Sequence, residues 1–169
     1  MQKQVLASVV AAMVLLSPRL AQPHVPRFRL RDLNAMHSAA VERALAGAAR
    51  RLESAECRRI FADFRDRSGA PLQDRLDTLG LEAPDYLSFI VFANGAGSRS
   101  CHGTDIMAIT APLSRVVFVC GQSFAAAEAR SPQRAEVVVL HEALHTLGLG
   151  ESPPDSLEIT RRVAERCAP

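Results

Sequence analysis

The residues whose types and spacing can do chemistry lie together in the stretch HEALHTLGLGE, residues 141–151. His141 and His145 are four positions apart, so a helix stacks them on one face and aims both imidazoles at a common point. Imidazole nitrogens are preferred ligands of zinc, and a zinc ion that keeps one position open for water takes three protein ligands. The spacing therefore predicts two zinc ligands on one helix and requires a third from elsewhere.

Two glutamates suit the remaining roles. Glu142 lies about 100° around the helix from the first histidine, so its carboxylate can reach a water on the ion rather than the ion itself. It can act as the general base that takes a proton as this zinc-activated water attacks a carbonyl carbon, and later pass it to the leaving amine. Gly148 and Gly150 can end the helix and take positive φ, which turns Glu151 back beneath the metal as the third ligand.

The helix that carries the histidines has clear boundaries in the sequence. Ser131 can be its N-cap and Pro132 its first helical residue, and the segment runs to about Leu147. The run VVVLHEALHTL is apolar nearly all round, which predicts that this helix is largely buried.

The other elements follow from periodicity and turn residues. Apolar residues at helical spacing over 34–66 predict a long amphipathic helix, and Pro71 to Leu79 predicts a short one that ends at Gly80. Asp155 can cap a short closing helix. Three strands are expected, of which the last two form a hairpin: 86–93, 106–111 and 115–120.

Length and the N-terminal pattern bound the organisation. The chain has 169 residues, of which 48% are apolar, which predicts one compact domain over 34–169. Lys3 precedes a largely apolar run from Val5 to Leu16, which is too short to span a bilayer and is typical of a secretory signal. We therefore expect a signal peptide over 1–21 with an uncertain cleavage site, an extended lead-in over 22–33, and a secreted or periplasmic protein with no stable membrane span.

Charge and cysteines narrow the function further. The acidic residues number 18 and are matched by arginines beyond the signal, so no basic surface for nucleic acid is predicted. The even cysteine set lacks a C-x-x-C pair and predicts two disulfides. Three pairings are possible, and the sequence favours Cys101 with Cys120, which flank the hairpin, and Cys57 with Cys167, which would tie two helices together. The oligomeric state is not predicted.

The motif resembles that of a known enzyme family. His141-Glu142-x-x-His145 is the zincin metallopeptidase signature, and with Gly148 and Glu151 it is similar to the metzincin pattern H-E-x-x-H-x-x-G-x-x-H. The acidic last position is most similar to snapalysin-type small secreted bacterial metallopeptidases, which have aspartate there. The resemblance implies a Zn2+-dependent endopeptidase that acts on proteins or peptides, with ligands at the two histidines and the last glutamate, and Glu142 as base.

The resemblance also implies a fold. It is an α+β, zincin-like domain with a small, mostly antiparallel sheet packed on a buried active-site helix, a long N-terminal helix and a short C-terminal helix. In the related gluzincins a glutamate of the following helix is the third ligand, which keeps Glu165 and, less favoured, Glu158 as alternatives to Glu151. Glu158 has a capping explanation with Asp155, and Glu165 lies in the charged run RRVAER, which is typical of a solvated face.

The sequence leaves open which residue stabilises the transition state and whether the protein is an enzyme. No tyrosine or histidine follows His145, so Arg161 or Arg162 would have to stabilise the intermediate, and the loop residue His102 could lie near the cleft. No methionine follows Met107, so the Met-turn that supports a metzincin site is missing. These absences support a second hypothesis, a non-catalytic, exported, disulfide-stapled binding module with a structural metal or none.

Overall fold

The computed structural model describes residues 27–103 and 105–168. The predicted signal peptide and residues 22–26 of the lead-in lie outside these ranges. The rest of the lead-in is not merely extended, because it contributes strand β1 (Arg29–Arg31) to the sheet. Within the described ranges, no helix is long and apolar enough to cross a membrane.

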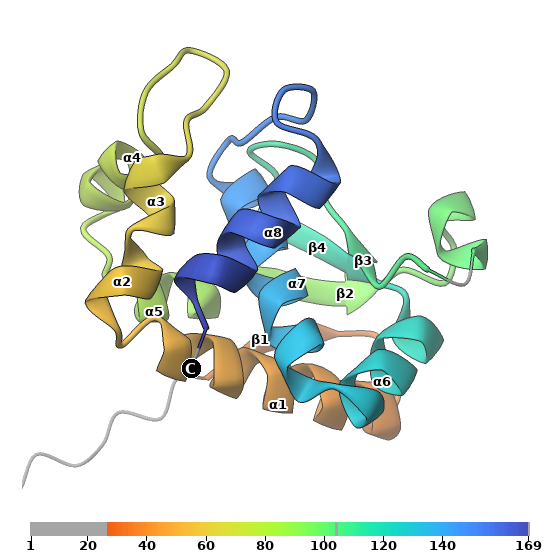
Figure 1. Cartoon of the computed structure of the whole chain (residues 1–169). Helices are drawn as coiled ribbons and strands as arrows, with labels where there is room; N and C mark the ends of the chain where they lie inside the picture. Colours follow the sequence, from red (N-terminus) through yellow and green to blue (C-terminus); the bar gives the residue numbers. More distant parts are fainter. Residues whose placement is uncertain (1–26, 104, 169) are drawn as a thin grey trace, which may run out of the picture.

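A small mixed sheet and a set of helices make up an α+β fold (Figure 1). The sheet has the order β1-β2-β4-β3, with β2 over Val91–Asn94, β3 over Ala108–Ile109 and β4 over Val116–Val119. The pairs β1-β2 and β2-β4 are parallel and only β3-β4 is antiparallel. The β3-β4 hairpin was predicted correctly, whereas the expectation of a mostly antiparallel sheet is wrong. Parallel neighbours need long crossovers, and the helices between β1 and β2 supply one.

The expected long N-terminal helix is broken into pieces. Helix α1 covers Ala35–Arg51, and after a turn the chain continues in the short helices α2 (Ala55–Arg58) and α3 (Ile60–Asp63). At the break the Arg58 guanidinium donates to the carbonyls of Leu52 and Glu53, which the end of the helix leaves without helical partners. The prediction of one helix over 34–66 is therefore wrong beyond Arg51.

The middle of the chain is more helical than predicted. Helix α4 (Leu72–Leu79) ends at Gly80 in the left-handed conformation, as expected. The segment 86–93 was predicted as a strand, but its first part lies in helix α5 (Ala83–Tyr86) and the 3-10 turn η1 (Leu87–Phe89). Pro84 near the start of α5 fixes a helical φ and explains this local preference. Helix α6 (Gly121–Arg130), which follows β4, was not predicted at all.

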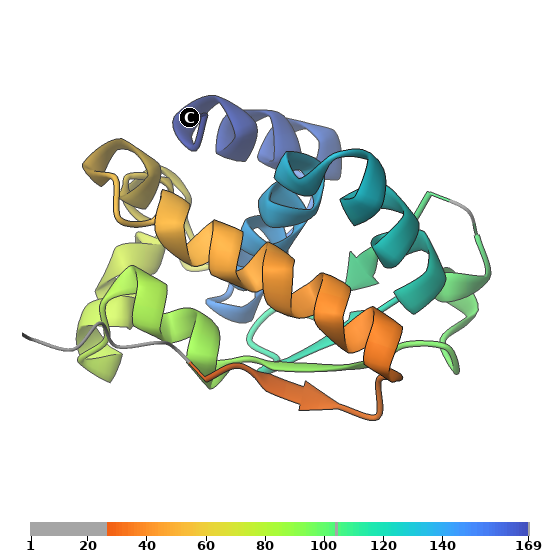
Figure 2. The same cartoon turned by 90° about the horizontal axis from the view of Figure 1, so that it is seen from below.

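Helix α7 (Pro132–Thr146) runs through the interior between α1 and α8 (Ser156–Arg166) (Figures 1 and 2). The Ser131 hydroxyl accepts the Arg134 amide at the start of α7, and the Asp155 carboxylate accepts the Glu158 amide at the start of α8, as predicted. Helices α1, α6 and α7 lie on the same side of the sheet (Figure 2). The core therefore forms between one sheet face and these helices.

Both predicted disulfides are present. Cys57 in α2 is bonded to Cys167 at the end of α8, and Cys101, in the loop before the hairpin, is bonded to Cys120, directly after it. Disulfides of this kind form in oxidising compartments, so the two bonds indicate an environment outside the cytoplasm.

Candidate metal centre

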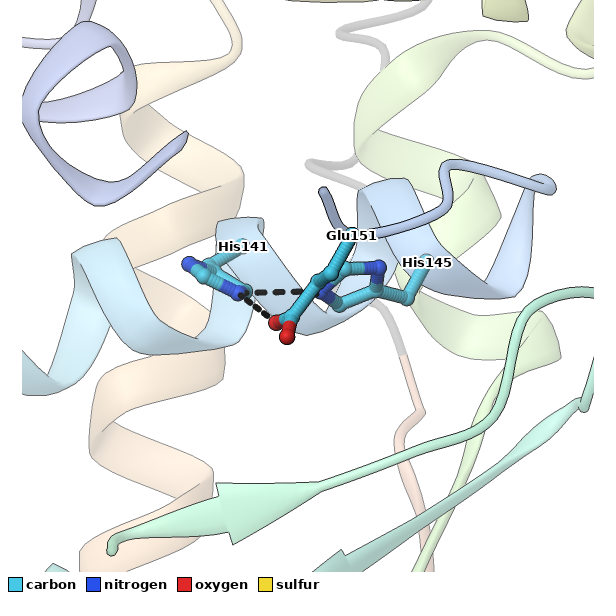
Figure 3. A group of neighbouring side chains, drawn as sticks. All are labelled: His141, His145 and Glu151. Carbon is cyan, nitrogen blue, oxygen red and sulfur yellow. Dashed lines mark hydrogen bonds and ion pairs between the residues drawn. The ribbon is translucent and has the colours of Figure 1, made fainter. Parts of the chain in front are cut away.

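The imidazoles of His141 and His145 meet on the buried surface of α7 (Figure 3). Their Nε2 atoms are 3.0 Å apart, and their side chains are only 7% and 5% exposed. The helix brings them together because residues four apart share a face. Each ring points its Nε2 atom toward the other, which is the arrangement that a shared metal ion requires.

Glu151 completes the group from the turn that follows α7. Gly148 has φ +115°, a conformation that favours glycine, and it reverses the chain so that Glu151 returns to the histidines. The Glu151 Oε1 atom lies 3.3 Å from His145 Nε2 and 3.9 Å from His141 Nε2. Gly150 was also expected to take positive φ, but it does not.

The spacing of these donor atoms fits a small tetrahedral ion. Ligands at about 2.0 to 2.1 Å from zinc with tetrahedral angles are about 3.3 to 3.4 Å from one another. The three donor pairs here lie at 3.0, 3.3 and 3.9 Å, and His141, His145 and Glu151 each offer a ligand atom within 4.8 Å of the others. The group can therefore hold a metal ion with only small adjustments of the side chains.

Each imidazole has a fixed partner on its other nitrogen. His145 Nδ1 donates to the Leu149 carbonyl at 2.9 Å, and because a carbonyl only accepts, a neutral His145 must keep the lone pair on Nε2. His141 Nδ1 lies 2.9 Å from the Thr160 hydroxyl of α8, which can accept a hydrogen bond from this nitrogen or donate one to it. Such outer partners orient metal-binding histidines and select the tautomer. The sequence alone did not reveal Thr160, because it lies 19 residues from His141 on another helix.

Burial also sets the charge of the group. Burial, followed by the proximity of His145, lowers the pKa of His141 from 6.5 to about 4, so this imidazole is neutral with a lone pair available at neutral pH. Burial, followed by the negative charge of Glu151, raises the pKa of Glu142 from 4.5 to about 8. The Glu142 Oε2 atom is buried and has no hydrogen-bond partner within the described residues. Buried polar atoms are seldom left without a partner, so this oxygen points to a ligand or water.

The centre opens into a cleft of about 470 Å³, so it is not sealed in the core. The carboxylates of Glu142 and Glu151 and both imidazoles line it. The edge strand β3 and the residue after it line the cleft through Ala108, Ile109 and Thr110, and Arg67 lines it as well. A molecule in the cleft can therefore contact the candidate metal ligands, the Glu142 carboxylate and a strand edge together.

The alternative third ligands lie elsewhere. The Arg161 guanidinium binds Glu158 at 2.8 Å and Glu165 at 2.6 Å on the exposed face of α8, and neither carboxylate joins the histidines. The Arg161 guanidinium is therefore paired with these two carboxylates. Arg162 stacks over the Phe64 ring at 4.3 Å.

These positions correct two sequence expectations about the reaction. Arg161 and Arg162, which were considered for transition-state stabilisation, do not line the metal cleft. His102 lines a separate cleft next to the Cys101–Cys120 disulfide, so the suggestion that it lies near the site is wrong. The cation that does line the metal cleft is Arg67, which no sequence pattern indicated because it comes from a loop 74 residues before His141.

A buried hydrogen bond supports the helix next to the site. The Tyr86 hydroxyl and the Thr146 hydroxyl are 2.8 Å apart, and Thr146 also donates to the Ala143 carbonyl. Tyr86 was expected to begin a strand, but it ends α5 and is buried. It contacts the residue after His145, so it helps to fix the last turn of α7.

No protein-family model, curated protein or solved structure matches this chain. The function is therefore argued from the site itself.

Proposed function

We propose that this protein is a zinc-dependent metallopeptidase of the zincin type, exported from the cytoplasm. One observation carries the proposal: two imidazoles and the Glu151 carboxylate converge in an open cleft, while the Glu142 carboxylate beside them has an oxygen without a partner. Three ligands with one open position are typical of catalytic zinc, whereas structural zinc sites are closed by four protein ligands.

His141, His145 and Glu151 would hold the ion. Two nitrogens and one carboxylate oxygen suit zinc, and the donor spacing supports this choice over a calcium or magnesium site, which would need more oxygen ligands. Zinc bound there would supply Lewis acidity, which lowers the pKa of a water and polarises a carbonyl oxygen. The neutral state of His141 favours metal binding at pH 7, because no proton has to be displaced.

Glu142 would move the proton. It is the remaining carboxylate that lines the cleft, and burial raises its pKa to about 8 in the metal-free protein. A base of this kind takes a proton from the attacking water and passes it to the nitrogen of the broken peptide bond. The positive charge of a metal ion held by the neighbouring ligands would lower the pKa of Glu142, so that it would be a carboxylate, able to accept a proton, in the loaded site.

The edge strand offers a place for an extended substrate. β3 pairs with β4 on one side only, and its residues Ala108 and Ile109 line the cleft beside the histidines. Free backbone groups of an edge strand can pair with an added strand. A peptide held there would lie with its backbone across the centre, which favours cleavage within a chain.

The variant Glu142→Gln tests the proposal. It should retain one zinc per chain but lose at least about 100-fold in the hydrolysis of fluorescein-labelled casein, since general-base catalysis contributes about 10²- to 10⁴-fold. Glu165→Gln is the matched control, because it makes the same substitution on the exposed face of α8 and should behave as the parent protein. Equal cleavage by Glu142→Gln and the parent would refute the assignment of the base.

Metal content separates this function from the non-catalytic module. A zinc-loaded parent that cleaves neither casein nor a random peptide library, and that unfolds when a chelator is added, would favour a structural metal. Glu151→Gln should weaken zinc binding while Glu165→Gln should not. The opposite result would make Glu165 the third ligand.

A further inference from the structure

We propose that Arg67 binds a carboxylate group of the substrate and makes the cleft selective for acidic peptides. This inference rests on the proposed peptidase function and names the substrate class of the same site. Arg67 lines the metal cleft together with Glu142 and Glu151, and it is the one lysine or arginine of the described residues that does so.

The loop that carries Arg67 is a tightly built hairpin. The Asp66 carboxylate accepts hydrogen bonds from the Ser68 amide, the Ser68 hydroxyl and the Ala70 amide, at 2.8, 2.6 and 3.0 Å. The Asp66 amide donates to the Ala70 carbonyl at 2.9 Å, and Gly69 takes φ +86° at the turn. These bonds hold the Asp66 carboxylate inside the turn, bonded to Ser68 and Ala70 and not to Arg67.

The hairpin is docked on the segment that delivers the third ligand. Asp66 forms an isolated β-bridge with Leu149, two residues before Glu151. The side chain of Arg67 then lies over Gly150: a Cβ added at this glycine would be 3.3 Å from Arg67 Nε and 3.5 Å from Arg67 Cγ. A glycine at position 150 thus leaves room for the Arg67 side chain beside the third metal ligand. This explains why position 150 is a glycine although its φ is not positive.

The charge of Arg67 has no internal partner. Its guanidinium forms no ion pair or hydrogen bond with any residue that the structure describes. The two negative charges of Glu142 and Glu151 would balance a divalent ion, so the guanidinium leaves the loaded cleft with one net positive charge. A guanidinium binds a carboxylate through two parallel hydrogen bonds, which an ammonium group cannot do.

The shared chemistry of the ligand is a carboxylate, and it has two sources in a peptide. An aspartate or glutamate side chain near the cleaved bond would make the protein an endopeptidase with an acidic preference. The carboxylate of the chain end would instead make it cleave close to C-termini. Both sources would bring a single negative charge to the same guanidinium.

Matched peptides distinguish these cases. The values of kcat/KM are compared for peptide pairs that differ only by Glu or Gln at one position near the cleaved bond. A second set of pairs differs only in a free or an amidated C-terminus. At one position, or at the free C-terminus, the parent should prefer the acidic peptide. Arg67→Gln should lower this ratio about 10- to 100-fold, the range of a charge-assisted hydrogen bond to a desolvated group.

The control is Arg65→Gln, which makes the same substitution in the same hairpin. Arg65 donates to the Gly69 carbonyl at 3.0 Å and does not line the cleft, so its variant should keep the parent ratio. Melting curves for both variants show whether the hairpin is intact. A parent without acidic preference, or an unchanged ratio in Arg67→Gln, overturns the inference even if peptides are cleaved.

A binding measurement keeps the test independent of turnover. Zinc-loaded Glu142→Gln protein, with and without Arg67→Gln, is titrated with the Glu and Gln forms of the same peptide. The Kd should favour the Glu form only when Arg67 is present. If this preference is found but the parent cleaves nothing, the proposed function fails while the carboxylate site stands. Equal Kd values for both forms overturn the carboxylate site.

Discussion

Replacing Thr160 by valine should weaken zinc binding about 10- to 100-fold without removing a metal ligand. The Thr160 hydroxyl is 2.9 Å from His141 Nδ1, and the His141 side chain is only 7% exposed, so water has little access to take its place. Valine has nearly the same shape but no hydroxyl. A buried nitrogen left without its hydrogen bond costs about 1 to 3 kcal/mol, which corresponds to about 5- to 150-fold in Kd. Losses of 10- to 100-fold are typical when an outer partner of a metal-binding histidine is removed.

The assay is a competition titration against a chromophoric zinc chelator at fixed pH. Thr160→Ser should restore the affinity, because it keeps the hydroxyl. Thr78→Val is a matched control: its hydroxyl donates to the Asp74 carbonyl on the exposed side of α4, and its loss should leave the Kd unchanged. Melting of the metal-free variants reports any effect on packing alone.

One result would refute the reasoning. If Thr160→Val binds zinc as tightly as the parent and melts at the same temperature, the orientation of His141 does not depend on α8. The position of the imidazole would then be set by the packing of α7 alone, and Thr160 would have no part in orienting His141.

Further predictions concern stability. Replacing both cysteines of the Cys57–Cys167 disulfide by alanine should lower the free energy of unfolding by up to about 5 kcal/mol, and removing the other disulfide should lower it by about 3 kcal/mol. The first disulfide costs more to lose because it closes a span of 110 residues, whereas the second closes one of 19. Urea titrations measure both losses. In the metal-free protein the raised pKa of Glu142 means that the folded state keeps a proton that the unfolded chain releases above pH 4.5. The free energy of unfolding should therefore fall by about 2 kcal/mol between pH 6.5 and 8. The lowered pKa of His141 makes stability rise with pH, but mainly below pH 6.5, so it does not mask this fall. Glu142→Gln should abolish the fall. Gly148→Ala should cost about 1 kcal/mol or more, seen as a lower urea midpoint, because φ is +115° there and the new Cβ would lie 3.0 Å from a neighbouring side chain.

Local signals explain what the sequence could predict. Ser131 and Pro132 set the start of α7, and the spacing of His141 and His145 placed both imidazoles on one face, because caps and helical periodicity act over a few residues. Glu151 could be anticipated as their neighbour since only a short glycine turn separates it from the helix.

Long-range relations were not visible in the same way. The sheet direction depends on β1, a strand of three residues whose parallel partner β2 lies some 60 residues later, and such short segments carry little periodic signal. At the break after α1 the Arg58 guanidinium binds the carbonyls of Leu52 and Glu53, and helical periodicity does not indicate such a contact. Thr160 and Arg67 contact the site from distant elements, so no spacing within one element could have indicated them.

The closing helix α8 supplies support that the sequence seemed to lack. No Met-turn follows the motif, yet Thr160 contacts His141 directly, and Ile159 and Val163 of the same helix are buried. Thr160 and Cys167 are seven residues apart, so they lie on the same face of α8, and the disulfide to Cys57 fixes the far end of that face. We therefore expect reduction of this disulfide to weaken zinc binding through Thr160, and an equal Kd in the oxidised and reduced proteins would show that α8 holds its position by packing alone.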